Sequence, residues 1–108
     1  MESLKKNREF KQIYSRRRSV ANHLLVLYVQ DNGLQKNRLG VSISRKVGCA
    51  VVRNRIKRQI KEYLRIHKEY ILTGYDLVVV VRTASAKAGF DQIGRSLYSL
   101  LVRHNMVK

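Results

Sequence analysis

The chain of 108 residues contains no proline, no tryptophan and one cysteine, Cys49. A single cysteine excludes an internal disulfide and a cysteine-rich zinc site. The histidines His23, His67 and His104 are tens of residues apart and show no metal-ligand spacing. We therefore expect no metal site held by the protein, and we interpret Cys49 as a small residue in a tight loop rather than a reactive thiol.

Acidic residues are scarce too, with seven Asp and Glu in the whole chain. No two are spaced to place a carboxylate pair on one helical face, although folding could still unite distant acids. A two-metal nuclease needs clustered carboxylates that hold its ions about 4 Å apart. The chain also lacks a Walker-type glycine loop, a nucleophile-elbow serine and a histidine pair. We expect no catalytic residue in the protein, so any catalysis requires reactive groups from another molecule.

Long apolar runs are missing as well. The longest, 24–29 and 77–81, are far below the roughly 18 residues of a membrane-spanning helix. No apolar segment follows the charged N-terminus, so the sequence predicts no secretory signal. We expect a cytoplasmic protein with no membrane partner. Its length and 44% apolar composition predict a single domain, 1–108, with one modest core.

Positive charge is what the chain has in abundance: 23 Lys and Arg give a formal net charge of +16. Such self-repulsion disfavours a compact chain unless a polyanion offsets it, which predicts a nucleic-acid partner. The charge is clustered, with nine basic residues and one acid in 45–68, and seven basic residues and one acid in 5–18. Two clusters indicate two contacts; the alternative is a merely solvated basic surface.

Apolar periodicity predicts an α+β protein in which helices cover one face of a sheet and leave part of the other face free. The expected elements are a short helix with Asn7 as its N-cap, strands at 23–29 and 38–44, a basic helix at about 50–67, a strand at about 76–81 covered on both faces, and a final helix with Asp91 as its N-cap. The strand at 38–44 alternates, which predicts one apolar face (Leu39, Val41, Ile43) and one open face (Gly40, Ser42, Ser44).

The basic helix has two faces of opposite chemistry. On a wheel of 100° per residue, one stripe holds Val52, Ile56, Ile60 and Tyr63. The opposite stripe holds Asn54, Arg58, Lys61 and Arg65. We expect the first face to pack and the second to meet an anion.

The segment 48–58, with the triplet Arg53-Asn54-Arg55 at its centre, resembles the signature of the bacterial ribonuclease P protein subunit. The resemblance continues through 39–46, 4–10 and 19–22, and so covers most of the chain. It implies three helices and a small central sheet of about four strands in the order αβββαβα. It also implies a left-handed βαβ crossover that carries the Arg-Asn-Arg helix, against the general rule for parallel crossovers.

The resemblance implies a function: binding a large catalytic RNA in a holoenzyme that hydrolyses the 5′ leader from precursor tRNA, with Mg²⁺ held mainly by the RNA. The partners would be the ribonuclease P catalytic RNA and precursor tRNA, and no DNA. The resemblance assigns these residues to the surface that binds the catalytic RNA: Arg45, Lys46, Arg53, Asn54, Arg55, Lys57, Arg58, Lys61 and Arg65. For each of them the alternative is a solvated surface residue.

A second site, a cleft for the single-stranded leader, is also implied by the resemblance. Its matching positions are Phe10, Tyr14, Tyr28, Ser42 and Ser44. Flat aromatic rings suit unstacked bases, and small polar residues allow a backbone to approach closely. By pattern alone, Phe10 and Tyr14 are core residues at i and i+4 of a helix.

Two other classes fit the charge. A ribosomal or general RNA-binding module without enzyme activity would share the basic helix, but it has no reason to prefer a tRNA precursor with a 5′ extension. A helix-turn-helix DNA reader needs two short helices joined by a tight turn. The strand immediately before the basic helix argues against that class.

Overall fold

A computed structural model describes residues 1–16 and 18–108; residue 17, in the N-terminal basic cluster, lies outside the described residues. One mixed sheet with strand order β1-β4-β5-β3-β2 runs through the molecule. The elements are β1 (Glu2–Ser3), α1 (Asn7–Ser15), β2 (Ser19–Ala21), β3 (Leu25–Asp31), β4 (Arg38–Ile43), α2 (Ala50–Ile66), the 3-10 turn η1 (Lys68–Tyr70), β5 (Tyr75–Val81), the 3-10 turn η2 (Thr83–Lys87) and α3 (Phe90–Arg103).

The topology confirms the α+β class and the order αβββαβα, with one extra strand at the front. β4 and β5 are parallel neighbours joined by α2, which is the predicted βαβ unit. β3 pairs antiparallel with both β5 and β2. The sheet has five strands rather than about four because β1 pairs with the edge of β4. A two-residue strand shows no alternation, so no pattern could have indicated it.

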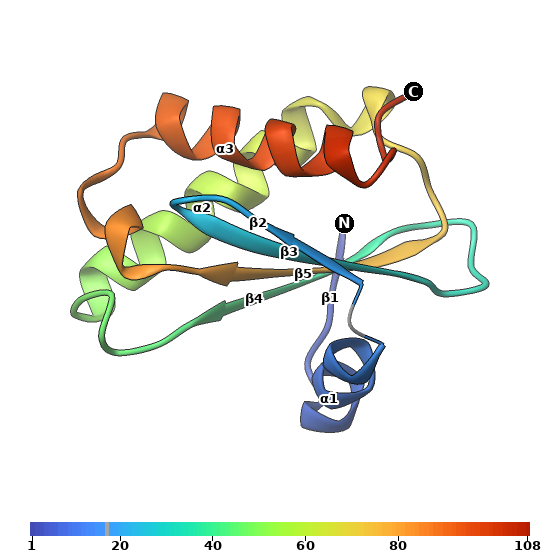
Figure 1. The fold of residues 1–108 in the computed structure, drawn as a ribbon, viewed down its shortest axis with the longest axis horizontal. Coiled ribbons are helices and arrows are strands. Elements are labelled where there is room, and N and C mark those ends of the chain that lie inside the picture. Colours follow the sequence, from blue (N-terminus) through green and yellow to red (C-terminus); the bar gives the residue numbers. More distant parts are fainter. Residues whose placement is uncertain (17) are drawn as a thin grey trace.

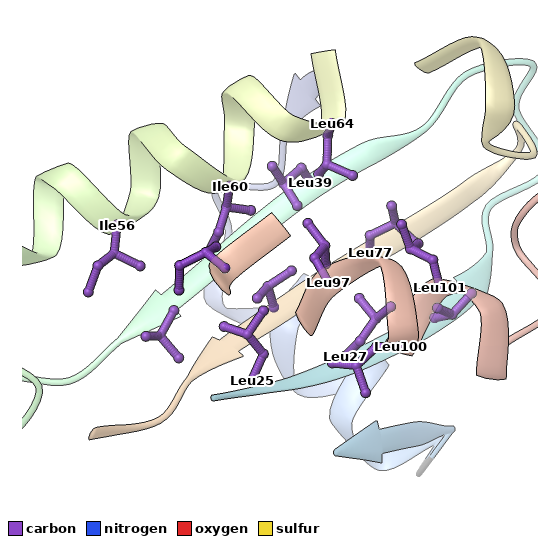
Figure 2. Close-up of a cluster of buried hydrophobic side chains, with 14 of the residues drawn as sticks. Leu25, Leu27, Leu39, Ile56, Ile60, Leu64, Leu77, Leu97, Leu100 and Leu101 are labelled. Atoms are coloured by element: carbon purple, nitrogen blue, oxygen red, sulfur yellow. The ribbon is translucent and has the colours of Figure 1, made fainter. Parts of the chain in front are cut away.

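The sheet separates two layers of helices (Figure 1). α2 and α3 cover one face, and α1 lies against the other. The main core fills the space between the sheet and the pair α2 and α3, and Figure 2 shows its leucine and isoleucine side chains converging there. Each fully buried side chain of this kind stabilises the fold by about 1.5–3 kcal/mol. None of the helices in the described ranges is both long enough and apolar enough to span a bilayer.

The central strand β5 contributes to both layers. Leu77, Val79 and Val81 join the main core, whereas Val78 packs into a smaller cluster under α1 with Leu4 and Ile13. This explains the unbroken valine run and confirms a strand covered on both faces.

The expectation of an open face on β4 is correct only at its end. Gly40 is buried because α1 lies over it, Ser42 is half-buried, and Ser44 is exposed beyond the strand.

Two predicted helix caps are wrong. α1 starts at Asn7 with Lys6 as its N-cap, and α3 starts at Phe90 with Gly89 as its N-cap. In each case the side chain three residues into the helix satisfies the cap: Glu9 Oε1 accepts from the Lys6 N–H (3.2 Å). Gln92 Oε1 accepts from the Gly89 N–H in the same way (3.0 Å). Each of these contacts satisfies the N–H group of the N-cap residue, which is one half of a capping box; Lys6 and Gly89 have no acceptor side chain to supply the other half.

The first long strand also begins later than expected. β3 starts at Leu25 rather than at His23, because the Asn22 Oδ1 accepts from the N–H groups of Leu24 and Leu25 and closes a turn before the strand. The same Asn22 amide donates to the Ser96 carbonyl, so this turn is tied to α3.

Candidate nucleic-acid interface

The two faces of helix α2 are apolar and basic, as the helical wheel predicts. Ile56, Ile60 and Leu64 are at most 1% exposed and face the core. The exposed side of the same helix carries Asn54, Lys57, Arg58, Lys61 and Arg65. The apolar stripe thus fixes which way the polar stripe points, and the fold presents these five side chains outward on one helix.

Arg53 and Arg55 are half-buried at the edges of α2. Arg55 Nη2 donates a 2.7 Å hydrogen bond to the Ala86 carbonyl oxygen, which joins α2 to the η2 turn. The Nε atoms of both arginines are buried and have no hydrogen-bond partner among the described residues. A guanidinium has five N–H donors, so Arg55 can hold η2 and still offer donors to a phosphate.

The loop between β4 and α2 places Arg45 and Lys46 at the surface. The Val47 N–H donates to the Ser44 carbonyl oxygen (3.1 Å) and closes a turn, while the Val47 side chain is buried and anchors it. Two cations are therefore held on a short anchored loop immediately before the basic helix.

Cys49 is the N-cap of α2 and its side chain is exposed. The backbone N–H groups of Val52 and Val51 lower the pKa of its thiol below the usual range.

The last basic residue of the helix is engaged within the chain. Arg65 donates from Nε to Glu62 Oε2 (3.1 Å) and from Nη2 to Glu62 Oε1. This exposed pair lowers the pKa of Glu62 and raises that of Arg65. Among the described residues, Lys57, Arg58 and Lys61 of this helix, like Arg45 and Lys46 of the preceding loop, form no ion pair with a carboxylate.

On the other face of the sheet, three aromatic rings lie together. The ring centroids of Phe10 and Tyr14 are 6.3 Å apart, and those of Tyr14 and Tyr28 are 4.9 Å apart with an edge-on geometry. Beside them is a cleft of about 360 Å³ lined by Asn7, Phe10, Lys11, Tyr14, Val41 and Ser42.

Three of the five expected cleft residues, Phe10, Tyr14 and Ser42, therefore line one hollow. Tyr28 contacts the Tyr14 ring edge-on but, like Ser44, lies outside the lining.

Several residues that build this cleft were missed by sequence reasoning. A Cβ atom built on Gly40 would lie 2.6 Å from the Phe10 Cζ, so only glycine lets the ring rest on the strand. A glycine inside a strand often marks such a close approach, and this signal was available. Asn7 and Lys11, one helical turn apart, line the cleft as well.

Arg38 was missed too. Its Nε and Nη2 donate to both carboxylate oxygens of Asp76 (2.8 and 2.7 Å), and its Nη1 donates to Glu9 of α1 (3.2 Å). The bond to Asp76 raises the pKa of Arg38. The parallel register of β4 and β5 places Arg38 opposite Asp76, and the packing of α1 brings Glu9 to the same guanidinium group.

The donor set does not fit a protein-held Mg²⁺ ion. Within 1–16 and 18–108, no group of three or more His, Cys, Asp and Glu is arranged to hold a metal. The carboxylates on the α1 side of the sheet, Glu9 and Asp76, both accept hydrogen bonds from Arg38. Mg²⁺ requires several oxygen ligands in near-octahedral geometry, and these residues do not supply them.

Comparison with known proteins gives one consistent result. A family model described as Ribonuclease P matches residues 1–105. The chain is 48% identical over 107 residues to the ribonuclease P protein component of Clostridium kluyveri, covering 97% of this chain and 96% of that protein. It is 46% identical over 98 residues to the ribonuclease P protein component of Caldanaerobacter subterraneus subsp. tengcongensis, covering 91% of this chain and 84% of that protein.

Solved structures agree with the sequence relatives. The Staphylococcus aureus RNase P protein superposes with a TM-score of 0.92 at 38% identity, covering 100% of this chain and 99% of that one. The RNase P protein of Thermotoga maritima superposes with a TM-score of 0.86 at 33% identity, covering 95% of this chain and 97% of that one.

Proposed function

Because this chain belongs to the ribonuclease P protein family, we propose that the basic face of α2 and the aromatic cleft beside α1 bind two different RNAs during tRNA 5′ maturation. The chain is a protein subunit of ribonuclease P, the holoenzyme that processes tRNA 5′ ends. A general RNA-binding module without an associated enzyme is not supported by these relatives. What the proposal adds is the assignment of surfaces to partners.

We assign the catalytic RNA to α2 and its preceding loop. The observation that carries the assignment is the exposed stripe of Asn54, Lys57, Arg58 and Lys61 opposite a fully buried isoleucine stripe. Arginine suits this contact because its planar fork grips a phosphate with two hydrogen bonds and remains charged at physiological pH. Each neutralised phosphate also releases counterions, so binding should weaken steeply as salt rises.

We assign the single-stranded 5′ leader to the cleft beside α1. Phe10 and Tyr14 offer ring faces to unpaired bases, Ser42 leaves room for a backbone, and Lys11 offers charge to a phosphate. Stacking on an aromatic ring contributes about 1–3 kcal/mol per base and tolerates any sequence. This fits a leader whose sequence differs between precursors.

In this proposal the RNA subunit carries out the cleavage reaction. Since no carboxylate cluster is found among the residues that the structure describes, we assign Mg²⁺ to the catalytic RNA, and the protein would screen repulsion between that RNA and the leader. The protein would then reduce the Mg²⁺ concentration that cleavage needs. Since its substrates are RNA transcripts, the proposal places the protein in the cytoplasm.

One reconstitution tests this function. Purified protein is added to a bacterial ribonuclease P RNA at a low Mg²⁺ concentration at which the RNA alone is inactive, and release of a labelled 5′ leader is followed. We expect the protein to restore cleavage. Failure to do so, or cleavage by protein freed of all RNA, would contradict the proposal.

A further inference from the structure

The aromatic residues of this protein form two groups on opposite faces of the sheet. Of the eight tyrosines and phenylalanines, Phe10, Tyr14 and Tyr28 lie together in the cluster beside α1. Four others line hollows between α2 and α3, which cover the other face of the sheet (Figure 1): Tyr63, Tyr70, Phe90 and Tyr98. This second group has no part in the function proposed above.

The hollows between α2 and α3 form one groove, here called the α2–α3 groove. Its middle, about 490 Å³, lies between Tyr63, His67, Phe90 and Tyr98. A hollow of about 270 Å³ shares Tyr63, His67 and Tyr98 and extends to Tyr70. A third, of about 440 Å³, shares Phe90 and extends to Arg55 and Arg58. From Arg58 to His67 the helix rises about 13 Å, which is long enough for a few unpaired nucleotides.

The floor of the groove is closely packed. Tyr63 packs against α3 where Gly94 lies, and a Cβ atom on Gly94 would be 2.9 Å from the ring. The ring of His67 is 4.4 Å from that of Tyr63, measured between centroids. Tyr63 and His67 are both half-buried with their ring planes tilted by 43°, and this pair forms the base of the groove between the helices.

The walls of the groove are exposed aromatic rings. Tyr70 is 64% exposed, Tyr98 50% and Phe90 39%. These rings are not used by the core. Large apolar surface that stays in water on a small protein marks a site for a partner.

The charges at the groove favour an anion over an apolar peptide. Arg58, Arg95 and Lys108 border it, and Asp91 and Glu62 are the acids. Glu62 is already paired with Arg65. Aromatic rings beside cations are the composition that binds single-stranded nucleic acid, because bases stack on the rings and phosphates meet the cations.

We propose that the α2–α3 groove binds a short unpaired stretch of the catalytic RNA, with bases stacked on Tyr98 and Tyr70. We assign the groove to the catalytic RNA because the groove is continuous, at Arg58, with the surface already assigned to that RNA. This inference therefore rests on the proposed function and extends its contact area around α2.

Affinity for the catalytic RNA tests the groove. The double variant Tyr98→Leu with Tyr70→Leu is expected to bind at least about fivefold more weakly, the low end of stacking one base on a ring. The slope of log affinity against log salt should not change, because no charge is removed. The ring-retaining variants Tyr98→Phe and Tyr70→Phe should bind within about twofold of wild type. Val102→Ala, at an exposed α3 position outside the groove lining, is the matched control.

A fluorescent reporter tests stacking directly. The chain has no tryptophan, so Tyr98→Trp introduces a single tryptophan into the groove, and its emission can be excited separately from that of the tyrosines. We expect its emission to be quenched when the catalytic RNA is added. Unchanged emission at saturating RNA would overturn the proposal.

The failures can be told apart. If Arg58→Ala reduces the salt slope while the leucine variant keeps wild-type affinity, the groove inference is wrong and the proposed function stands. If Arg58→Ala changes neither affinity nor slope, the assigned RNA surface is wrong. If the leucine variant changes only self-association in sedimentation, the groove is a contact between two copies of this chain and the proposal is wrong.

Discussion

The guanidinium group of Arg38 is fixed by the carboxylate of Asp76 on the neighbouring strand through hydrogen bonds of 2.8 and 2.7 Å. Asp76 is buried and Arg38 half-buried, so this pair is protected from solvent screening. The remaining Nη1 atom reaches Glu9 in the first turn of α1. The position of α1, and of the rings that it carries, is thereby set from the centre of the sheet.

We predict that Glu9→Gln loosens α1 without unfolding the protein. The substitution keeps the shape of the side chain but removes its charge pair with Arg38, which costs less than about 1 kcal/mol for a pair near the surface. Binding of precursor tRNA by the holoenzyme should weaken while affinity for the catalytic RNA stays unchanged. Glu69→Gln, exposed and after α2, is the control. Equal effects of the two substitutions would refute a positioning role for Glu9.

We predict that Gly40→Ala displaces the Phe10 ring. The new Cβ would lie 2.6 Å from Phe10 Cζ, and such overpacking costs about 1–3 kcal/mol of unfolding free energy, measurable by urea denaturation. Gly89→Ala, where a Cβ meets nothing within 4 Å, should cost less. In a Phe10→Ala background the cost of Gly40→Ala should largely disappear, because the ring is gone. Additive costs in this double-mutant cycle would contradict the contact.

We predict that Phe10→Ala weakens holoenzyme binding of precursor tRNA more than binding of mature tRNA. The reason is that only the precursor has a leader to stack in the cleft, and one lost base contact corresponds to about 1–3 kcal/mol. Equilibrium binding of the two labelled RNAs measures the difference. A similar loss for both would indicate damage to folding rather than to the leader site.

The sequence was sufficient for the features that depend on neighbours along the chain. The α2 stripe follows from helical periodicity, so the exposure of Arg58 and the burial of Ile60 were both predictable. The same reasoning found the valine run of β5 and its two covered faces.

Features that depend on register could not be predicted in the same way. Arg38 and Asp76 are opposite each other only because β4 and β5 pair in parallel with that register. Arg55 was expected to bind the catalytic RNA or to be a solvated surface charge, yet it also donates a hydrogen bond to the carbonyl oxygen of Ala86, which folding brings close to it. Gly40 gave a local signal, but only the placement of α1 shows which ring it accommodates.

We predict that Arg58→Ala reduces the slope of log affinity against log salt by about one for the catalytic RNA, because one phosphate contact is lost. Arg65→Ala should have a smaller effect, since Arg65 is already paired with Glu62. Arg55→Ala should lower both RNA affinity and protein stability, because it also breaks the bond to Ala86. Filter binding at several salt concentrations, with thermal melting of each variant, separates these outcomes. Equal slopes for Arg58→Ala and Arg65→Ala would count against the assigned surface.

We predict that Cys49 reports on RNA binding through its thiol. The N–H groups of Val52 and Val51 favour the thiolate, so the pKa of Cys49 is lower in the folded chain than in the unfolded chain. Alkylation by iodoacetamide should therefore reach half its maximal rate at a lower pH in the native protein than in urea, because only the thiolate reacts. Since Cys49 lies between the Arg45 loop and α2, catalytic RNA should slow the reaction at constant pH. Identical pH profiles in buffer and urea would contradict the effect of these N–H groups on the thiol. Unchanged alkylation at saturating RNA would place the bound RNA away from this end of the helix.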